Sequence, residues 1–80
     1  MEKHKTTLAD LERGETATIT EIRADGTIRQ RLLDFGFRPG VPVKVVRLAP
    51  LADPIELMIS GSYVSLRRSE ASLISVERRA

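Results

Sequence analysis

An 80-residue chain with a net charge of +2 and no cysteine leaves room for one small core and excludes a second domain. It also excludes a disulfide framework and a thiolate metal site. The charge bias is weaker than that of dedicated nucleic-acid binders. Because the apolar runs are short and the start of the chain is polar, we expect a cytoplasmic protein that is not inserted in the membrane.

The start of the chain predicts a short helical turn followed by a strand. Residues 1–6 are polar and are expected to be disordered or frayed, so that a single folded domain spans residues 7–78. Thr7 is suited to cap a helical turn over residues 8–11. Residues 16–22, TATITEI, alternate and are rich in β-branched side chains, which is typical of a strand.

The hydrophobic period changes after this strand. Ile28, Leu32 and Phe35 follow one another at i, i+4 and i+7, which places them on one face of a helix. Either Asp25 or Thr27 is suited to cap its start. The pattern predicts an amphipathic helix that turns these three apolar side chains toward the core.

The stretch after this helix contains two glycines and a proline. Gly36 stands where a helix C-terminus favours a left-handed backbone, and Phe37 is then expected to fold back against Leu32. Pro39 and Gly40 suit the centre of a type II turn. A phosphate-binding loop would place its glycines before a helix rather than after one, so we favour a structural role over a ligand loop.

The rest of the chain is mostly strand-like and predicts a mainly β fold. Five short strands, one helix after the first strand and short helical turns indicate a small, strongly bent barrel. Pro54 and Gly61 mark turns between strands, and Ser69 is expected to begin a final helical turn. The later strands are predicted over residues 42–49, 55–60, 63–68 and 74–77, with a loop over residues 50–54.

No pattern in the chain supports catalysis, and we predict that it is not an enzyme. Its single histidine, His4, lies in the polar N-terminal segment, without a nucleophile whose activation it would serve. Asp53 and Glu56 are weak metal candidates that form no closed site alone, so at most a weakly bound divalent transition metal is expected.

A small barrel with several arginines also raises the possibility of nucleic-acid binding. Such binding needs exposed aromatic side chains for stacking as well as cations. Because the helix and its end account for both phenylalanines, only Tyr63 is left, and no nucleic-acid partner is expected.

Several apolar residues have no evident place in the core. Leu33 lies off the buried helix face, Val46 and Leu48 alternate against Val43 and Val45, and Leu51 is in a loop. Met58 likewise points away from the inward face of its strand. Together with nearby arginines, such residues are typical of an apolar binding patch with a basic rim.

The chain resembles the ferrous-iron transport protein A (FeoA) family from about Leu8 to Glu77. The resemblance implies an SH3-like β-barrel with a helix inserted after the first strand, related to the C-terminal domain of iron-dependent repressors. It is carried by four motifs: L-x-x-L-x-x-G-E (Leu8, Leu11, Gly14, Glu15), L-x-x-x-G-x-x-P-G (Leu32, Gly36, Pro39, Gly40), A-P-L-x-D-P (Ala49 to Pro54) and S-L-R-x-x-E-A (Ser65 to Ala71).

The resemblance also implies a non-enzymatic accessory of the ferrous-iron permease of the inner membrane. The cytoplasmic GTP-hydrolysing domain of that permease is the expected partner. A metal-binding or metal-sensing module and a nucleic-acid-binding barrel are the alternatives. The residues expected to dock on the partner are Arg29, Arg31, Leu33, Phe37, Arg38, Leu48, Leu51 and Asp53.

Overall fold

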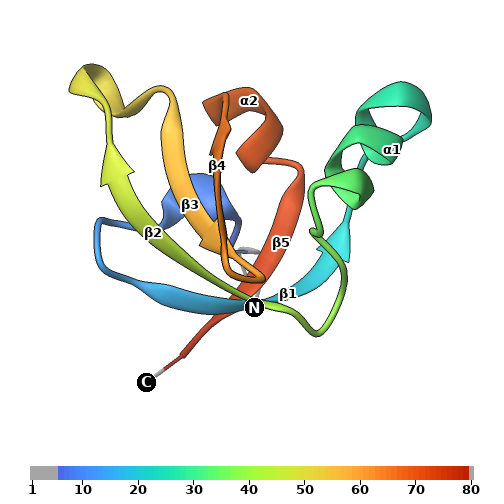
Figure 1. Ribbon diagram of the computed structural model, residues 1–80, viewed down its shortest axis with the longest axis horizontal. Coiled ribbons are helices and arrows are strands. Elements are labelled where there is room, and N and C mark those ends of the chain that lie inside the picture. Colours follow the sequence, from blue (N-terminus) through green and yellow to red (C-terminus); the bar gives the residue numbers. More distant parts are fainter. Residues whose placement is uncertain (1–5, 80) are drawn as a thin grey trace, which may run out of the picture.

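The computed structural model describes residues 6–79, which form a mainly β domain with one longer helix at its side (Figure 1). The predicted order of elements, with a helix after the first strand, is confirmed. The elements are η1 (Leu8–Asp10), β1 (Thr16–Ile22), α1 (Gly26–Asp34), β2 (Pro42–Leu48), η2 (Pro50–Ala52), β3 (Ile55–Ile59), β4 (Ser62–Leu66), α2 (Arg68–Ala71) and β5 (Ile74–Arg78).

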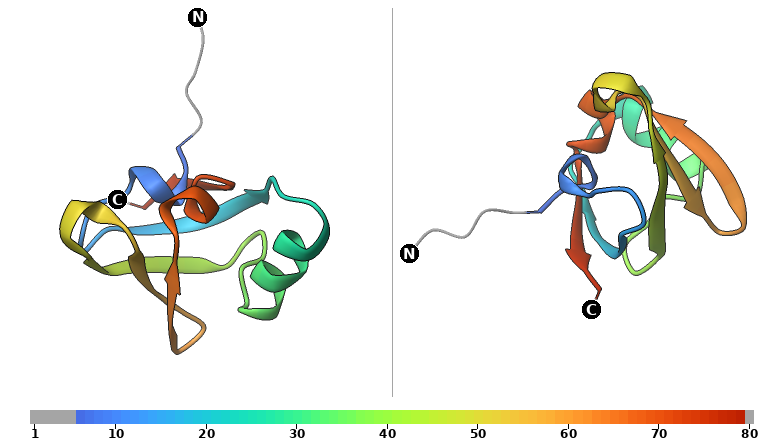
Figure 2. Two further views of the ribbon diagram at one scale, coloured as in Figure 1. Left: turned by 90° about the horizontal axis from the view of Figure 1, so that it is seen from above. Right: turned by 90° about the vertical axis from the view of Figure 1, so that its left-hand side faces the viewer.

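The strands form one antiparallel sheet in the order β4-β3-β2-β1-β5. The register shifts once between β1 and β5 and once between β2 and β3, and such bulges bend and twist a sheet. The sheet accordingly curls over on itself, as the two views of Figure 2 show. Since no ladder joins β4 to β5 within residues 6–79, the SH3-like sheet is strongly curved but open.

The two edges of the sheet differ. Beyond β5, Thr7 forms a bridge with Ser75, and the backbone N–H of Val76 donates to the carbonyl of Thr6 at 2.8 Å. Ordered pairing therefore begins at Thr6, one residue earlier than predicted. The rest of the predicted frayed segment, His4 included, lies outside the described residues. Within residues 6–79, β4 has no strand on its outer side.

The inward faces of the curved sheet enclose the core. Inward alternation is confirmed along β3, and in β1 and β2 up to the register shifts after Ile19 and Val45. Burial of these apolar side chains is the main source of stability. The core residues are Leu8, Ala9, Leu11, Ala17, Ile19, Ile22, Leu32, Phe37, Val43, Val45, Ile55, Leu57, Ile59, Leu66, Ala71, Ile74 and Val76.

Helix α1 ends in the predicted glycine cap. Gly36 has φ of 101°, and its N–H donates to the carbonyl of Leu33 at 2.9 Å. The next N–H, of Phe37, donates to the carbonyl of Leu32 at 3.1 Å. These paired bonds form a Schellman motif, which satisfies the last helix carbonyls and folds Phe37 back toward Leu32.

The Pro39–Gly40 turn is also confirmed. The N–H of Val41 donates to the carbonyl of Arg38 at 3.1 Å, and Gly40 has φ of 90° at the position where a type II turn requires it. Both glycine positions thus serve the path of the chain from α1 to β2.

The prediction that α1 buries three apolar side chains is wrong for two of them. Leu32 is fully buried, whereas Ile28 is 44% exposed and Phe35 is 37% exposed. The helix stands beside the sheet instead of lying across it, so only its C-terminal turn reaches the core (Figure 1). It begins at Gly26 after Asp25, whose side chain makes no capping hydrogen bond.

The start of α2 and the loop before β3 also differ from prediction. The helix begins at Arg68 rather than Ser69, because carboxylates satisfy its first N–H groups: Asp53 accepts from Arg68 and Glu70 accepts from Arg67, each at 3.0 Å. The predicted loop over residues 50–54 contains the short helix η2. Among residues 6–79, no helix has the length and hydropathy that a membrane span requires.

Candidate functional site

One end of the molecule is built from η2, α2 and α1, with α2 between the other two (Figure 1). Side-chain contacts hold this order. Glu70 of α2 forms an ion pair with Arg31 of α1, and Asp53, which follows η2, accepts the hydrogen bond from the N–H of Arg68. We call this region the helical end. The contact between Arg31 and Glu70 joins residues 39 positions apart, which no local pattern indicates.

Leu51 forms the tip of the helical end on the η2 side. Its residue is 97% exposed, and its backbone has φ of 70°, a left-handed conformation that costs a leucine about 1–2 kcal/mol. The turn beneath it is closed by two hydrogen bonds: Ala52 N–H to the Ala49 carbonyl at 2.7 Å, and Ala49 N–H to the Pro54 carbonyl at 3.1 Å. The backbone therefore holds a complete leucine side chain in solvent.

Phe37, which we expected to contact a partner, is fully buried and does not belong to any surface. The glycine cap predicted from the sequence already indicated that Phe37 is buried, because the residue at this position packs on the last helical turn. The phenylalanine that the structure exposes is Phe35. Together with Ile28, it gives α1 two partly exposed apolar side chains that the sequence pattern assigned to the core.

Leu48 and Leu33 are partly buried. Leu48 packs against the core and pairs with Ile55, although strict alternation predicted that it faces away from Val45. The reason is the bulge between Val45 and Arg47, which adds a residue and reverses the alternation beyond it. Leu48 therefore turns toward the core instead of the surface.

The three candidate arginines around α1 are exposed, and two of them have partners within the domain. Arg29 donates from Nη1 to the carbonyl of Ile22 at 3.2 Å. Arg31 pairs with Glu70 and also lies over the Phe35 ring, 5.3 Å from its centroid. Arg38 makes no side-chain hydrogen bond or ion pair with any residue of 6–79. Arg38 thus adds an exposed positive charge on the α1 side of the helical end.

The two weak metal candidates are engaged with other groups. One oxygen of Asp53 accepts from the Arg68 N–H, and Glu56 lies 3.7 Å from the Arg47 guanidinium. Across residues 6–79, no three acidic or histidine side chains gather closely enough to hold a metal ion. The donor set of the described chain does not by itself fit a metal centre.

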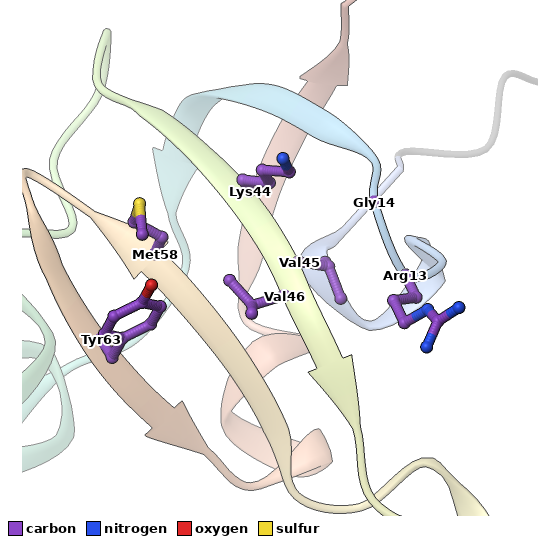
Figure 3. A pocket seen from close by; sticks show the side chains of 7 residues that line it. All are labelled: Arg13, Gly14, Lys44, Val45, Val46, Met58 and Tyr63. Atoms are coloured by element: carbon purple, nitrogen blue, oxygen red, sulfur yellow. The ribbon is translucent and has the colours of Figure 1, made fainter.

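A second feature lies on the outer face of the sheet, away from the core. Tyr63 of β4 and Met58 of β3 lie next to each other there, with Lys44 and Val46 on the neighbouring β2 (Figure 3). Together with Arg13 and Gly14 they line an open hollow of about 380 Å³. The sequence pattern singled out Val46 and Met58 as apolar residues without a core role, but it did not connect them with Tyr63 and Lys44.

The curved antiparallel sheet and the helix after β1 define a small SH3-like domain. A family model described as the FeoA domain matches residues 6–78. The chain therefore belongs to the FeoA domain family and is a non-catalytic accessory domain, which confirms the resemblance and the prediction that it is not an enzyme.

Relatives of known name support this membership. A fusion of Fe(2+) transport protein A with the Fe(2+) transporter FeoB from Porphyromonas gingivalis is 41% identical over 70 residues, which are 88% of this chain and 8% of that protein. The iron(II) transport protein A of Clostridium thermocellum has a TM-score of 0.88 at 37% identity, over 91% of this chain and 45% of that one. The chain thus spans only a small part of the curated relative and less than half of this solved one.

Two further similar structures are complexes with a metal ion. The Stenotrophomonas maltophilia FeoA, an SH3 domain protein in complex with zinc, has a TM-score of 0.75 at 28% identity, over 90% of this chain and 89% of that one. A manganese-dependent transcriptional repressor in complex with manganese has a TM-score of 0.85 at 24% identity, over 98% of this chain and 38% of that one. The repressor shares the fold.

Proposed function

We propose that this domain is a cytoplasmic accessory of ferrous iron transport that docks on the cytoplasmic GTP-hydrolysing domain of a FeoB-type permease. The observation that carries the proposal is the Porphyromonas gingivalis relative, in which a domain 41% identical to this chain is joined to the transporter FeoB. A covalent link keeps two modules at a high effective concentration, which favours a contact that is weak between separate chains.

The helical end is the docking surface that we propose. A leucine held in solvent by a left-handed backbone has no stabilising role for the domain itself, since it makes almost no buried contact. Such strain is typical of residues that serve binding. Leu51 therefore anchors on the partner from the η2 side, while Ile28, Leu33 and Phe35 supply apolar area from α1.

The basic groups beside these side chains steer the domain toward an acidic partner. Arg38 is exposed and without a side-chain partner among the described residues, so its charge is fully available to a second molecule. Arg29 and Arg31 use part of their donor capacity within the domain and keep their positive charge at the surface. Charge of this kind raises the association rate more than the affinity. Asp53 supports the surface by accepting the hydrogen bond from the first residue of α2, and Leu48 packs against the core beside η2 in the sequence.

The test is an amide NMR titration of the chain with the purified cytoplasmic domain of its permease. We expect shifts confined to α1, η2 and α2. Leu51→Asp should abolish them and leave the melting temperature unchanged, because Leu51 has no core contacts to lose. Tyr63→Asp is the matched control, since it places the same charge on an exposed residue of the outer sheet face. If Tyr63→Asp abolishes the shifts and Leu51→Asp does not, the helical end is not the docking surface.

Binding of a divalent transition metal is the second candidate function. The zinc complex of the Stenotrophomonas maltophilia relative is the observation in its favour. A ferrous or zinc titration of the same NMR sample separates the two functions. Saturable shifts around Asp53 that Asp53→Ala removes would support metal binding, whereas an unchanged spectrum would leave docking as the function.

A further inference from the structure

The outer face of the sheet carries a continuous groove along β2. Thr16, Lys44, Met58 and Tyr63 lie in one cross-strand row, because the register pairs each of them with the next. The hollow of about 380 Å³ meets a second one of about 280 Å³ at Lys44 and Met58. The first extends toward Val46 and the second toward Pro42, which is a length of roughly 13 Å along the strand.

The floor of this outer groove is apolar and its charged rim has one sign. Val46, Met58 and Tyr63 supply aliphatic, thioether and aromatic surface, and Tyr63 is 68% exposed. Lys44 and Arg13 are the charged residues that line it, and no carboxylate lines either hollow. Neither cation makes a hydrogen bond or ion pair through its side chain with any residue of 6–79. An apolar floor beside two unpaired cations complements an anionic ligand with an apolar group.

We propose that the outer groove binds a short, extended, acidic peptide segment that carries one apolar side chain. The apolar side chain packs on Met58, Val46 and the Tyr63 ring, and flanking carboxylates pair with Lys44 and Arg13. A length of roughly 13 Å accommodates about four extended residues.

The same features argue against two other occupants. A nucleic-acid strand stacks its bases on several aromatic side chains, and this groove offers one. A second copy of this chain carries a net charge of +2, which does not complement a basic rim. The outer groove shares no residue with the helical end, so its occupancy is independent of docking through Leu51.

The test uses the full chain and a blocked pentapeptide, acetyl-Asp-Asp-Leu-Asp-Asp-amide, followed by amide NMR. We expect saturable shifts at Lys44, Val46, Met58 and Tyr63, and a weaker affinity when salt is raised from about 50 mM to about 300 mM. A peptide with lysine in place of aspartate should not bind. A peptide with glycine in place of leucine should bind at least ~tenfold more weakly.

Two variants with the same charge change locate the site. Lys44→Glu should weaken peptide binding at least ~tenfold, because it replaces an attraction with a repulsion. Arg23→Glu makes the same change at an exposed position outside the groove and should alter the affinity less than ~twofold. Because both side chains are exposed, both variants should keep the wild-type melting temperature.

The following outcomes would overturn the proposal. One is the absence of shifts in the groove at millimolar peptide, and another is equal weakening by both variants. Equally strong binding of the lysine peptide would remove the electrostatic argument. Tighter binding of a deoxythymidine oligonucleotide would assign the groove to nucleic acid, and groove shifts that depend on protein concentration alone would assign it to self-association.

Discussion

Phe37 and Leu51 are both large apolar residues in connections that lead into a strand, yet one is fully buried and the other is 97% exposed. At Phe37, two backbone hydrogen bonds return the chain to the last turn of α1 and direct the ring into the core. At Leu51, the hydrogen bonds of Ala49 close a turn beneath the residue, and Leu51 lies at its outer apex.

This difference shows that hydrophobicity alone does not assign a loop residue to the core or to the surface. The direction of the backbone decides, and the local hydrogen bonds set that direction. Burial of Phe37 in the core stabilises the domain, whereas Leu51 adopts a left-handed backbone and makes little contact within the domain. One residue therefore serves stability, and the other is available for recognition.

Truncating both side chains tests most directly whether Phe37 and Leu51 differ in their contribution to stability. Phe37→Ala should lower the free energy of unfolding by about 3–5 kcal/mol, because it leaves a cavity in the core. Leu51→Ala should change it by less than about 0.5 kcal/mol. Urea unfolding at equilibrium measures both. Comparable losses in the two variants would show that Leu51 packs within the domain.

Gly36→Ala tests the turn that buries Phe37. We expect a loss of about 1–2 kcal/mol, because an alanine is strained at φ of 101°. Space is not the cause, since the nearest side-chain atom to the added carbon is Ser60 Oγ at 3.7 Å. Ser60→Ala combined with Gly36→Ala should therefore recover no stability, and a full recovery would assign the loss to crowding.

The ion pair between Arg31 and Glu70, which joins α1 to α2, is expected to contribute less to the free energy of unfolding. Glu70→Ala removes the ion pair with Arg31 and the acceptor for the Arg67 N–H, which should lower the free energy of unfolding by about 1 kcal/mol. Glu56→Ala is the control, because its pair with Arg47 is longer, at 3.7 Å, and exposed on both sides. That variant should lose less than about 0.3 kcal/mol. Equal losses in chemical unfolding would contradict a structural role for Glu70.

Leu51→Asn tests the energetic cost of the left-handed backbone at this position. Asparagine tolerates the left-handed backbone better than leucine, so we expect a gain of about 0.5 kcal/mol in stability together with loss of docking. Thermal unfolding and the NMR titration with the permease domain measure the two effects. A loss of stability would mean that the leucine side chain supports η2.

The smallest effect expected is a pH dependence at Glu15. The Glu12 N–H donates to this carboxylate at 2.7 Å and the Arg78 guanidinium at 2.9 Å, and both hold the pKa of Glu15 below its usual value. The stabilisation is therefore present above about pH 4.3, the unfolded-state value, and is lost as the pH falls through the lower folded-state pKa. Comparing the urea midpoint of wild type and Glu15→Gln at about pH 6 and about pH 3 tests this. The difference between the two proteins should shrink at the lower pH, and a constant difference would contradict it.

Sequence patterns predict the parts of this fold that depend on neighbours along the chain. Alternation in residues 16–22 and 55–60 predicted strands, Thr7 predicted the cap of the first helical turn, and Gly36 with Pro39–Gly40 predicted the path from α1 to β2. Each of these signals is local, because caps, turns and alternation are set by residues a few positions apart.

The contacts between residues far apart in the sequence depend on the tertiary structure. It exposed Ile28 and Phe35, since α1 stands beside the sheet rather than across it. The bulge in β2 turned Leu48 toward the core. The row from Thr16 to Tyr63 crosses four strands, and the contact of Asp53 with the start of α2 joins residues 15 positions apart. Sheet register and packing angles set such contacts, and neither is recorded in a local pattern.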